Sequence, residues 1–493
     1  DGANIHDRCA ADESCGRPVL GVTRAQVDRI AQIARDNYGY EPGDFLASSP
    51  NEDEKLLVRF DWNVNENHNA VLTYNYNDGF NINESDDDAD EYEFSNHYYE
   101  RGAELTAYST QLFSDWTENF STELRVGYSE LDNRQQTVSD QLFGEVRIET
   151  YADVDGDGFE DRANVYLGGD DSRQTNFLNY DTFNLKLEGS WTVGDHVISA
   201  GYELEEYDIY NLFIQHSVGG EYRFDEERTN FDGNTVGCGR GGNPDGCIDQ
   251  FENFSPDDIY FGSAPSLDNL NAGINFKYGT NTLYIQDEFT LTQADVTIVA
   301  GLRYDWYASD DVPRENAGFI ARNGFSNATN FDGESLLQPR LGFSWDVSDT
   351  LSVRGGVGLY SGGNPNVWLS NAYSNDGFSV IQAREDDAGV EDLNIDPNNN
   401  LTTVPLGQDG TGRPIHDAPQ GFFSFIQGQA GNSGTNGIDP NYKIPSNWKF
   451  SLGGTWLFDA GAMGEGYVLN GDIVLSRAQD SALYRDTTLI QYT

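Results

Sequence analysis

The segment DVDGDGFED at residues 153–161 has the residue types and spacing of a metal-binding loop. Carboxylates at Asp153, Asp155 and Asp157 alternate with a glycine-rich turn, as in the first half of an EF-hand loop. We expect them to bind Ca²⁺ together with the carbonyl of Phe159 and the carboxylate of Asp161, directly or through water. An asparagine stands where such a loop ends in a bidentate glutamate. An acidic β-turn without metal is therefore the alternative.

The four cysteines form two close pairs, Cys9 with Cys15 and Cys238 with Cys247, in polar segments. Four cysteines allow three disulfide connectivities. Pairing within each segment is the simplest, and it implies an oxidising compartment. A zinc site is the weaker interpretation, because neither pair has CxxC spacing and no His-x₃₋₅-His motif accompanies them.

Residues typical of catalysis are sparse. The six histidines are scattered over predicted turns and loops without metal-ligand spacing. The sequence contains neither a G-x-S-x-G elbow nor a phosphate-binding loop. We therefore expect a protein that is not an enzyme. The acidic run NESDDDADEYE at 83–93 is interpreted as a solvated loop, with divalent bridges to lipopolysaccharide as the alternative.

Composition limits the class of protein. The 493 residues include 82 acidic and 29 basic side chains, for a net charge of −53, and phosphate binding needs a basic surface, so we expect no nucleic-acid partner. Hydrophobic residues make up 37%, yet aromatic residues reach 13% and glycines number 53. A disordered acidic chain is poor in aromatic residues, and no run approaches the roughly 20 apolar residues of a membrane helix. These values predict an all-β protein with long polar loops.

Residues 337–363 show the pattern that predicts the strands. Large apolar residues such as Leu341 and Phe343 alternate with small or polar ones such as Gly342 and Ser344. A period of two places the two sets on opposite faces of a strand, and the break at 348–349 predicts an antiparallel hairpin. The same pattern recurs at 55–78, 100–132, 176–212, 281–308 and 446–478.

Short turns within the hairpins alternate with long segments between them, at 79–99, 133–175, 213–280, 309–335 and 362–444. Structureless loops beyond about 15 residues are uncommon in compact domains and are usually functional. We expect every tight turn at one end of the sheet and every long loop at the other. The hairpins would fill residues 51–479, residues 480–493 would begin a further loop, and residues 1–50, with a helix at Thr23–Tyr38 capped by Thr23, would belong to an extracellular loop.

This alternation favours a transmembrane antiparallel β-barrel over a sandwich or a propeller. Outer-membrane strands turn apolar side chains to lipid and polar ones to the interior, with short periplasmic turns and longer extracellular loops. Tyrosine and tryptophan collect near the predicted strand ends, as interfacial girdles require. The charged side chains expected to face the lumen, where they pair with neighbouring carboxylates or contact a substrate or plug, include Arg59, Asp61, Arg303, Asp305, Arg340 and Arg354.

One strand fits this scheme poorly. In TLYIQDEFTL, Asp287 falls in register with Leu283 and Ile285 and so belongs to the series expected to face lipid. The pattern offers no physical reason for a carboxylate at that position. The longest loop poses a second open question, because its phenylalanines, Phe422 among them, either pack that loop or contact a ligand.

Six stretches between residues 51 and 460 carry a resemblance to a known family, in this order: NEDEKLLVRFDWNVNENHNAVLTYNYNDG, GGDDSRQTNFLNYDTFNLKLEG, TLYIQDEFTL, LQPRLGFSWDVS, RGGVGLYSGGNPNVWLSNAYSNDG and YKIPSNWKFSLGGTW. Together they resemble the TonB-dependent receptors, and within them the Oar-like branch. The resemblance implies a 22-stranded barrel in the outer membrane of a Gram-negative bacterium, filled by a plug and powered by TonB.

The chain departs from that family pattern. It supplies about twelve predicted strands and no recognisable plug or TonB-interacting segment, and it opens at Asp1 without an initiator methionine. We expect the plug and the remaining strands to lie outside these residues, with closure of the twelve strands on their own as the alternative.

Two functions follow from the resemblance. The first is a transporter that imports, or exports, a large or scarce substrate of unknown identity, with loops that bind it at the cell surface, a plug that gates the lumen, and contacts to outer-membrane lipid and lipopolysaccharide. The second is a structural or adhesive surface protein whose acidic loops are stabilised by calcium.

Overall fold

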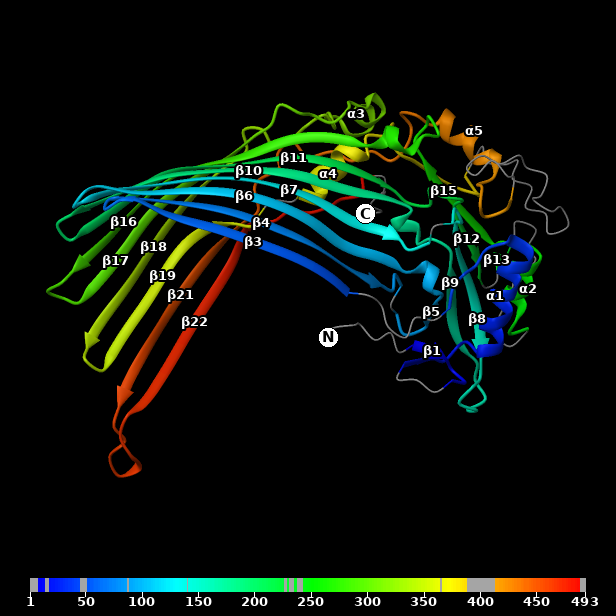
Figure 1. Ribbon diagram of the computed structural model, residues 1–493, viewed down its shortest axis with the longest axis horizontal. Coiled ribbons are helices and arrows are strands. Elements are labelled where there is room, and N and C mark those ends of the chain that lie inside the picture. Colours follow the sequence, from blue (N-terminus) through cyan, green and yellow to red (C-terminus); the bar gives the residue numbers. More distant parts are fainter. Residues whose placement is uncertain are drawn as a thin grey trace.

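The computed structural model describes residues 8–13, 17–44, 51–86, 88–139, 141–225, 228–229, 235–236, 243–363, 366–387 and 413–487. Its main sheet has twelve strands in the order β22-β21-β19-β18-β17-β16-β11-β10-β7-β6-β4-β3, an antiparallel meander that follows the chain (Figure 1). These strands are β3 (Asn51–Asn65), β4 (His68–Asn83), β6 (Tyr99–Thr117), β7 (Phe120–Thr137), β10 (Thr175–Val193), β11 (His196–Ile214), β16 (Ile274–Leu291), β17 (Val296–Ala308), β18 (Ser335–Ser348), β19 (Leu351–Ser361), β21 (Ser446–Phe458) and β22 (Tyr467–Asp480).

The two faces of the main sheet differ as the alternation predicts. Pairing places Leu283 of β16 beside Tyr304 of β17 and Leu337 of β18, so the large apolar series runs across neighbouring strands on one face. These side chains remain exposed in the folded chain. Exposed apolar patches of this extent indicate a surface that is covered by something apolar.

The main sheet is open. Its strand order ends at β3 and β22, and within the described residues neither edge strand has a second neighbour in that sheet. The twelve strands therefore do not close on their own here, and closure into the expected barrel needs further strands along these edges. In the same ranges, no helix is long and apolar enough to cross a membrane.

The long segments expected between the hairpins build a second sheet, with the order β20-β15-β12-β8-β9-β5. We call this sheet and the helices α1, α2 and α5 on it the loop domain. Its elements are β5 (Glu91–Glu93), β8 (Glu145–Ala152), β9 (Asp161–Leu167), β12 (Glu221–Phe224), β15 (Asp258–Ser263), β20 (Ile381–Arg384), α1 (Arg24–Tyr38), α2 (Gly246–Glu252) and α5 (Gln420–Gly428). Four of the long segments between the hairpins thus contain secondary structure of their own, which the sequence did not predict.

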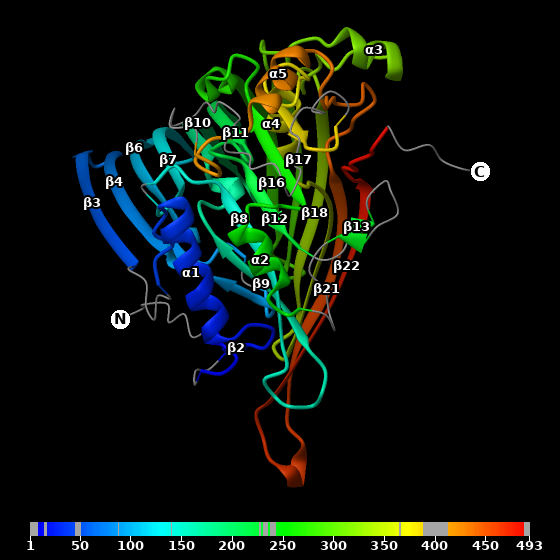
Figure 2. The ribbon, with the colours of Figure 1, turned by 90° about the vertical axis from the view of Figure 1, so that its right-hand side faces the viewer.

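Helix α1 forms as its sequence predicts. Thr23 is the N-cap, and its hydroxyl accepts from the backbone N–H of Gln26 while the Gln26 side chain accepts from the Thr23 backbone, which completes a capping box. Gly39 ends the helix in the left-handed conformation, with φ of 66°. The buried face, which includes Val27 and Ile30, joins a core shared with β8, β9, β12, β15 and α5. Figure 2 shows α1 and α2 side by side on this domain.

The core of the loop domain also accounts for the phenylalanines of the longest loop. Phe422 of α5 is fully buried, and its ring lies 6.0 Å from that of Phe261 in β15. Phe423 and Phe425 pack against the same core. These side chains therefore pack the loop.

Shorter elements complete the chain. We call the face of the main sheet opposite the large apolar series its inner face. Helix α4 (Asn366–Ser374) covers part of it, where the ring of Tyr373 stacks on that of Phe276 in β16 at 4.3 Å. Helix α3 (Ala317–Asn323) belongs to the segment that connects β17 to β18 along the chain. The remaining elements are β1 (Arg8–Ala10), β2 (Arg17–Val19), β13 (Arg228–Thr229), β14 (Thr235–Val236), η1 (Ser95–His97), η2 (Asp171–Arg173), η3 (Asn269–Ala272) and η6 (Gly461–Met463).

Candidate functional site

The inner face of the main sheet carries a hollow lined by charged and hydrogen-bonding side chains. Its volume is about 450 Å³, and it opens between β6, β7, β10, β11, β16 and β17. The polar lining includes Gln111, Arg125, Lys186, Glu203, Thr282 and Arg303. Small and polar residues alternate inward here because the apolar series points the other way.

Arg303 is the best-anchored of these side chains. One Nη donates to Oε2 of Glu203 at 2.8 Å and the other to Oγ1 of Thr282 at 2.9 Å. Its Nε lies 2.8 Å from Oδ1 of Asp305, which also accepts from the Thr282 hydroxyl at 2.7 Å. Asp305 and Thr282 are buried, so this guanidinium is held in one orientation by charge-assisted hydrogen bonds.

A second ion pair network lies beside it. Nζ of Lys186 on β10 is 3.1 Å from Oε2 of Glu123 on β7 and 3.2 Å from Oε2 of Glu188 on its own strand. The hydroxyl of Tyr284 on β16 donates to Glu188. The wall of the hollow thus presents both signs of charge, and Arg303, Lys186 and Glu203 are each paired with a neighbour of opposite charge.

The other arginines expected in the lumen lie apart from this hollow. Arg354 pairs with Asp472 of β22 at 2.7 Å, and Arg59 pairs with Asp61 along the exposed edge strand β3 at 2.8 Å. Arg340 lies over the ring of Tyr360, 4.5 Å from its centroid. The structure therefore brings Arg303 together with Asp305 and Arg59 together with Asp61, and it gives Arg340 and Arg354 other partners.

Several residues of the hollow and of the network beside it were not singled out by the sequence. Glu203 and Thr282 line the hollow, and Glu123 and Tyr284 belong to the network. Each meets its partner only through strand register, for example Thr282 opposite Asp305 and Glu203 opposite Lys186. The only available signal was their place in the inward series of each strand. These residues can be grouped only when the order of the strands in the sheet and their register are known.

The predicted calcium ligands lie on the turn between β8 and β9 in the loop domain. Carboxylate oxygens of Asp153, Asp155 and Asp157 lie within 4.8 Å of one another, on exposed side chains. Asp153 accepts from the backbone N–H groups of residues 156 and 158 at 2.9 and 3.1 Å, and both glycines there have positive φ. The side chain of Phe159 is 75% exposed, and Asp161 begins β9. Asx-type turns alone can produce this approach, so calcium stays a prediction.

A buried group of titratable side chains in the loop domain was missed by sequence reasoning. Nδ1 of His97 lies 3.1 Å from the carbonyl of Gly168, and Nε2 lies 2.9 Å from Oδ2 of Asp86. Both partners are acceptors, so both ring nitrogens donate and the ring is an imidazolium. Burial opposes this charge, but the Asp86 hydrogen bond and the nearby carboxylates, Glu93 first, hold the pKa of His97 well above its usual value.

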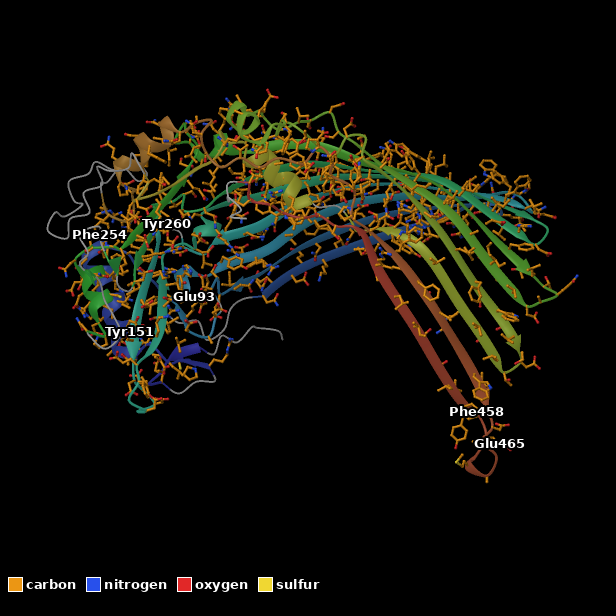
Figure 3. All side chains as sticks on the ribbon, turned by 180° about the vertical axis from the view of Figure 1, so that it is seen from behind. Glu93, Tyr151, Phe254, Tyr260, Phe458 and Glu465 are labelled. Carbon is orange, nitrogen blue, oxygen red and sulfur yellow. The ribbon has the colours of Figure 1, made fainter. Side chains whose placement is uncertain are left out.

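The neighbouring carboxylates respond to the same burial. Desolvation raises the pKa of Glu93, on β5, to about 8 (Figure 3). It also raises the pKa of Glu145 well above its usual value, with repulsion from Glu221 adding to the shift. Burying several carboxylates together is costly unless protons or cations neutralise them. This part of the loop domain therefore depends on its counter-charges.

Of the cysteines, Cys9 and Cys247 are buried and neither is a free thiol. Cys15 and Cys238 lie outside the described residues. Local pairing within the two segments stays a prediction.

Asp287, the exception on the apolar face, has a partner. Its Oδ2 lies 2.8 Å from Nδ1 of His196, whose ring stacks on that of Phe289 at 4.3 Å. His196 begins β11 directly after a tight turn, so the pair sits at the turn end of the sheet. A hydrogen-bonded polar pair beside aromatic side chains fits the interfacial zone of a membrane strand better than its centre.

Solved structures of outer-membrane proteins resemble the chain at low identity. The outer membrane transporter YddB from Escherichia coli matches with 14% identity and a TM-score of 0.45, over 83% of this chain and 38% of that one. The FrpB iron transporter from Neisseria meningitidis matches with 9% identity and a TM-score of 0.42, over 88% and 46%. The siderophore receptor PirA from Acinetobacter baumannii matches with 12% identity and a TM-score of 0.38, over 86% and 48%. The chain thus spans about half the length of these proteins or less.

No curated protein sequence matches the chain. A family model does: residues 25–465 match the outer membrane beta barrel domain. The match covers all strands of the main sheet up to β21 and most of the loop domain. The exposed apolar face, the polar inner face and this match agree, and the chain belongs to the outer membrane beta barrel domain family.

Proposed function

We propose that the chain is the barrel portion and the surface domain of a TonB-dependent transporter in the outer membrane of a Gram-negative bacterium. In this proposal the apolar face of the main sheet contacts lipid, and the inner face borders a lumen. Further strands close the barrel at β3 and β22, and a plug outside this chain fills it and contacts TonB. The loop domain then lies outside the cell, where it receives the substrate, with lipopolysaccharide around it.

The hollow around Arg303 is the observation that carries this proposal. Small β-barrels without a channel fill their narrow interior with packed side chains. Here the inner face leaves about 450 Å³ open beside anchored charges of both signs. A wall of fixed charges, such as the paired Arg303, Lys186 and Glu203, offers hydrogen bonds to a passing polar solute or to a plug without large reorganisation. A surface protein whose only role is adhesion has no need for such a wall.

The test is substrate depletion by living cells. Cells carrying the complete gene are grown beside a deletion strain and a strain without TonB, and spent media are compared by untargeted mass spectrometry. We expect at least one compound to be depleted by the first strain only. Depletion should weaken in the variant Arg303→Ala and persist in Arg59→Ala, which changes an arginine far from the hollow.

Two outcomes would contradict the proposal. The first is a medium that is identical for all strains while the deletion strain loses attachment to cells or surfaces, which would favour the adhesive alternative. The second is depletion that continues without TonB, which would favour a passive channel.

A further inference from the structure

A second candidate site lies where the main sheet meets the loop domain. Asp171 opens η2 just before β10, His216 follows the end of β11, and Glu221 is the first residue of β12. Because β10 and β11 are paired along their whole length, their loop-side ends bring Asp171 and His216 together. The turn after β11 then returns the chain so that Glu221 faces them.

The three side chains converge on one point. Nδ1 of His216 lies 3.0 Å from Oε2 of Glu221 and 3.5 Å from Oδ2 of Asp171, and one ligand atom from each residue falls within 4.8 Å of the others. The side chains are 12%, 2% and 20% exposed, in the order His216, Glu221, Asp171. Neither Nδ1 of His216 nor Oε2 of Glu221 has a hydrogen-bond partner. A buried carboxylate oxygen and an imidazole nitrogen thus lie 3.0 Å apart, close enough for an ion pair but outside good hydrogen-bond geometry. A third group bound to both atoms would satisfy them.

The rest of the cluster holds these atoms in place. The other oxygen of Glu221 accepts from Nε of Arg223, and Asp171 Oδ2 accepts from Nε2 of Gln215 at 3.2 Å. The backbone of His216 adopts φ of 55°, a left-handed conformation that a non-glycine residue rarely takes. Backbone strain of this kind persists where the surroundings fix a side chain in a particular direction.

We propose that Asp171, His216 and Glu221 form a binding site for a divalent transition-metal ion of the Zn²⁺ class. One imidazole and two carboxylates are a usual ligand set for such ions, whereas Ca²⁺ and Mg²⁺ take oxygen ligands. A doubly charged ion would add to the charge of Arg223, which already pairs with Glu221, in balancing the two carboxylates. Its structural effect would be to join the ends of β10 and β11 to β12, and so to fix the loop domain on the main sheet.

The opposing interpretation is that His216 is a protonated ring that only pairs with the two acids. Purified protein in detergent separates the two. After treatment with a chelator, the wild type is titrated with Zn²⁺ and with Co²⁺, and bound metal is measured by calorimetry and by mass spectrometry of the metal. The visible spectrum of Co²⁺ reports the nitrogen and oxygen ligands directly.

We expect one ion to bind per chain at this site. Loss of a ligand in His216→Ala or Glu221→Gln should weaken binding by about tenfold or more, since even residues behind the ligands contribute that much. His196→Ala removes a histidine at the opposite end of β11 and should bind as the wild type does. Asp155→Ala, in the predicted calcium turn, should leave Zn²⁺ binding unchanged. Zn²⁺ should also slow proteolysis of the loop domain in the wild type and not in Glu221→Gln, a variant that keeps the size of the side chain.

The proposal is wrong if the chelated wild type takes up neither ion, a result that does not depend on any variant folding. It is equally wrong if His216→Ala binds as tightly as the wild type, or if Asp155→Ala abolishes the binding. In those cases the cluster is an ion pair, or the metal occupies the exposed turn.

Discussion

Among single residues, His97 shows most clearly how burial and charge act together. Its side chain has no exposed area, yet both ring nitrogens donate to acceptors, so the folded loop domain binds a proton on this ring more tightly than the unfolded chain does. The groups that face it are carboxylates from several segments: Asp86, Glu93, Glu145 and Asp170. Protonation of this histidine is therefore linked to folding of the domain.

The sign of the pH dependence follows from these shifts. A histidine whose folded pKa lies above 6.5 contributes stability that is complete below that value and is lost as pH rises through the folded pKa. The pKa of Glu93 is raised from 4.5 to about 8, so its neutral form also stabilises the folded domain, and this contribution is lost as pH rises through that range. We expect the free energy of unfolding of the loop domain to fall as pH rises, from about 4.5 to about 8 through Glu93 and above 6.5 through His97. The fall should be about 1.4 kcal/mol for each unit of pKa shift.

The urea midpoint of the loop domain, followed by protease cleavage of β8, would measure this fall. His97→Gln should flatten the dependence above pH 6.5 and Glu93→Gln should reduce the part that ends near pH 8. A midpoint that rises with pH in the wild type would show that these groups titrate in the opposite sense.

The turn at 153–161 offers a second prediction for single residues. Three carboxylates held within 4.8 Å repel one another, and Ca²⁺ would remove that repulsion. We expect calcium to bind the wild type, to protect the turn from proteolysis, and to do neither in Asp155→Ala. Glu160→Ala, which removes an acid of the same turn outside the predicted ligand set, is the matched control. Calorimetry without heat on addition of Ca²⁺ to the wild type would favour the metal-free turn.

The candidate residues were predictable to different degrees. The turn at 153–161 is local, so its spacing alone brought Asp153, Asp155 and Asp157 together. The Asp171, His216 and Glu221 cluster joins three segments whose closeness depends on β10 and β11 being paired, and no local pattern marks it. Arg303 and Asp305 lie on one strand and were found, but Glu203 comes from β11 and was not.

At the scale of elements, the strands of the main sheet divide lipid-side from lumen-side residues. On β10, Leu187 is 52% exposed between Leu124 and Tyr202 on the apolar face. Asn184, on the same strand, faces the hollow opposite Glu205. A charged side chain should therefore be tolerated at position 184 and should destabilise the protein at position 187.

Leu187→Arg should destabilise the folded protein in lipid by about 2–4 kcal/mol if the position lies near the bilayer midplane. Asn184→Arg should cost little, because the new guanidinium can reach Glu205. Urea unfolding in lipid vesicles would compare the two variants with the wild type. Equal losses, or a larger loss for Asn184→Arg, would show that the faces are assigned the wrong way round.

Element types were predicted unevenly. Strands with a long period-two pattern, and α1 with its Thr23 cap, were found from the sequence. The loop domain was not, because strands such as β5 and β20 are only a few residues long and pair across large sequence separations. Their stability comes from a shared core that includes Tyr40, Phe143 and Tyr222, which no local window contains.

The whole molecule has two distinct ends. The tight turns of the hairpins gather at one end of the main sheet, and the loop domain occupies the other (Figures 1 and 3). In Figure 3, Phe458 and Glu465 mark the tip of the β21–β22 hairpin, far from Tyr151 and Tyr260 of the loop domain. Strands that cross a membrane in a meander must place these two ends on opposite sides of it.

This polarity gives a prediction about topology. An epitope tag inserted after Gly158, in the exposed β8–β9 turn, should bind antibody on intact cells if the loop domain is extracellular. The same tag after Glu465 should bind only after the outer membrane is permeabilised, because short turns face the periplasm. Both positions are exposed and lie outside the strands of the main sheet, so equal labelling of permeabilised cells is the control for folding and expression. Labelling on intact cells after Glu465 but not after Gly158 would show that the orientation is the reverse. Labelling at both positions would mean that the sheet does not separate two compartments. That arrangement is physically unfavourable, because it would leave the apolar face of the sheet in water.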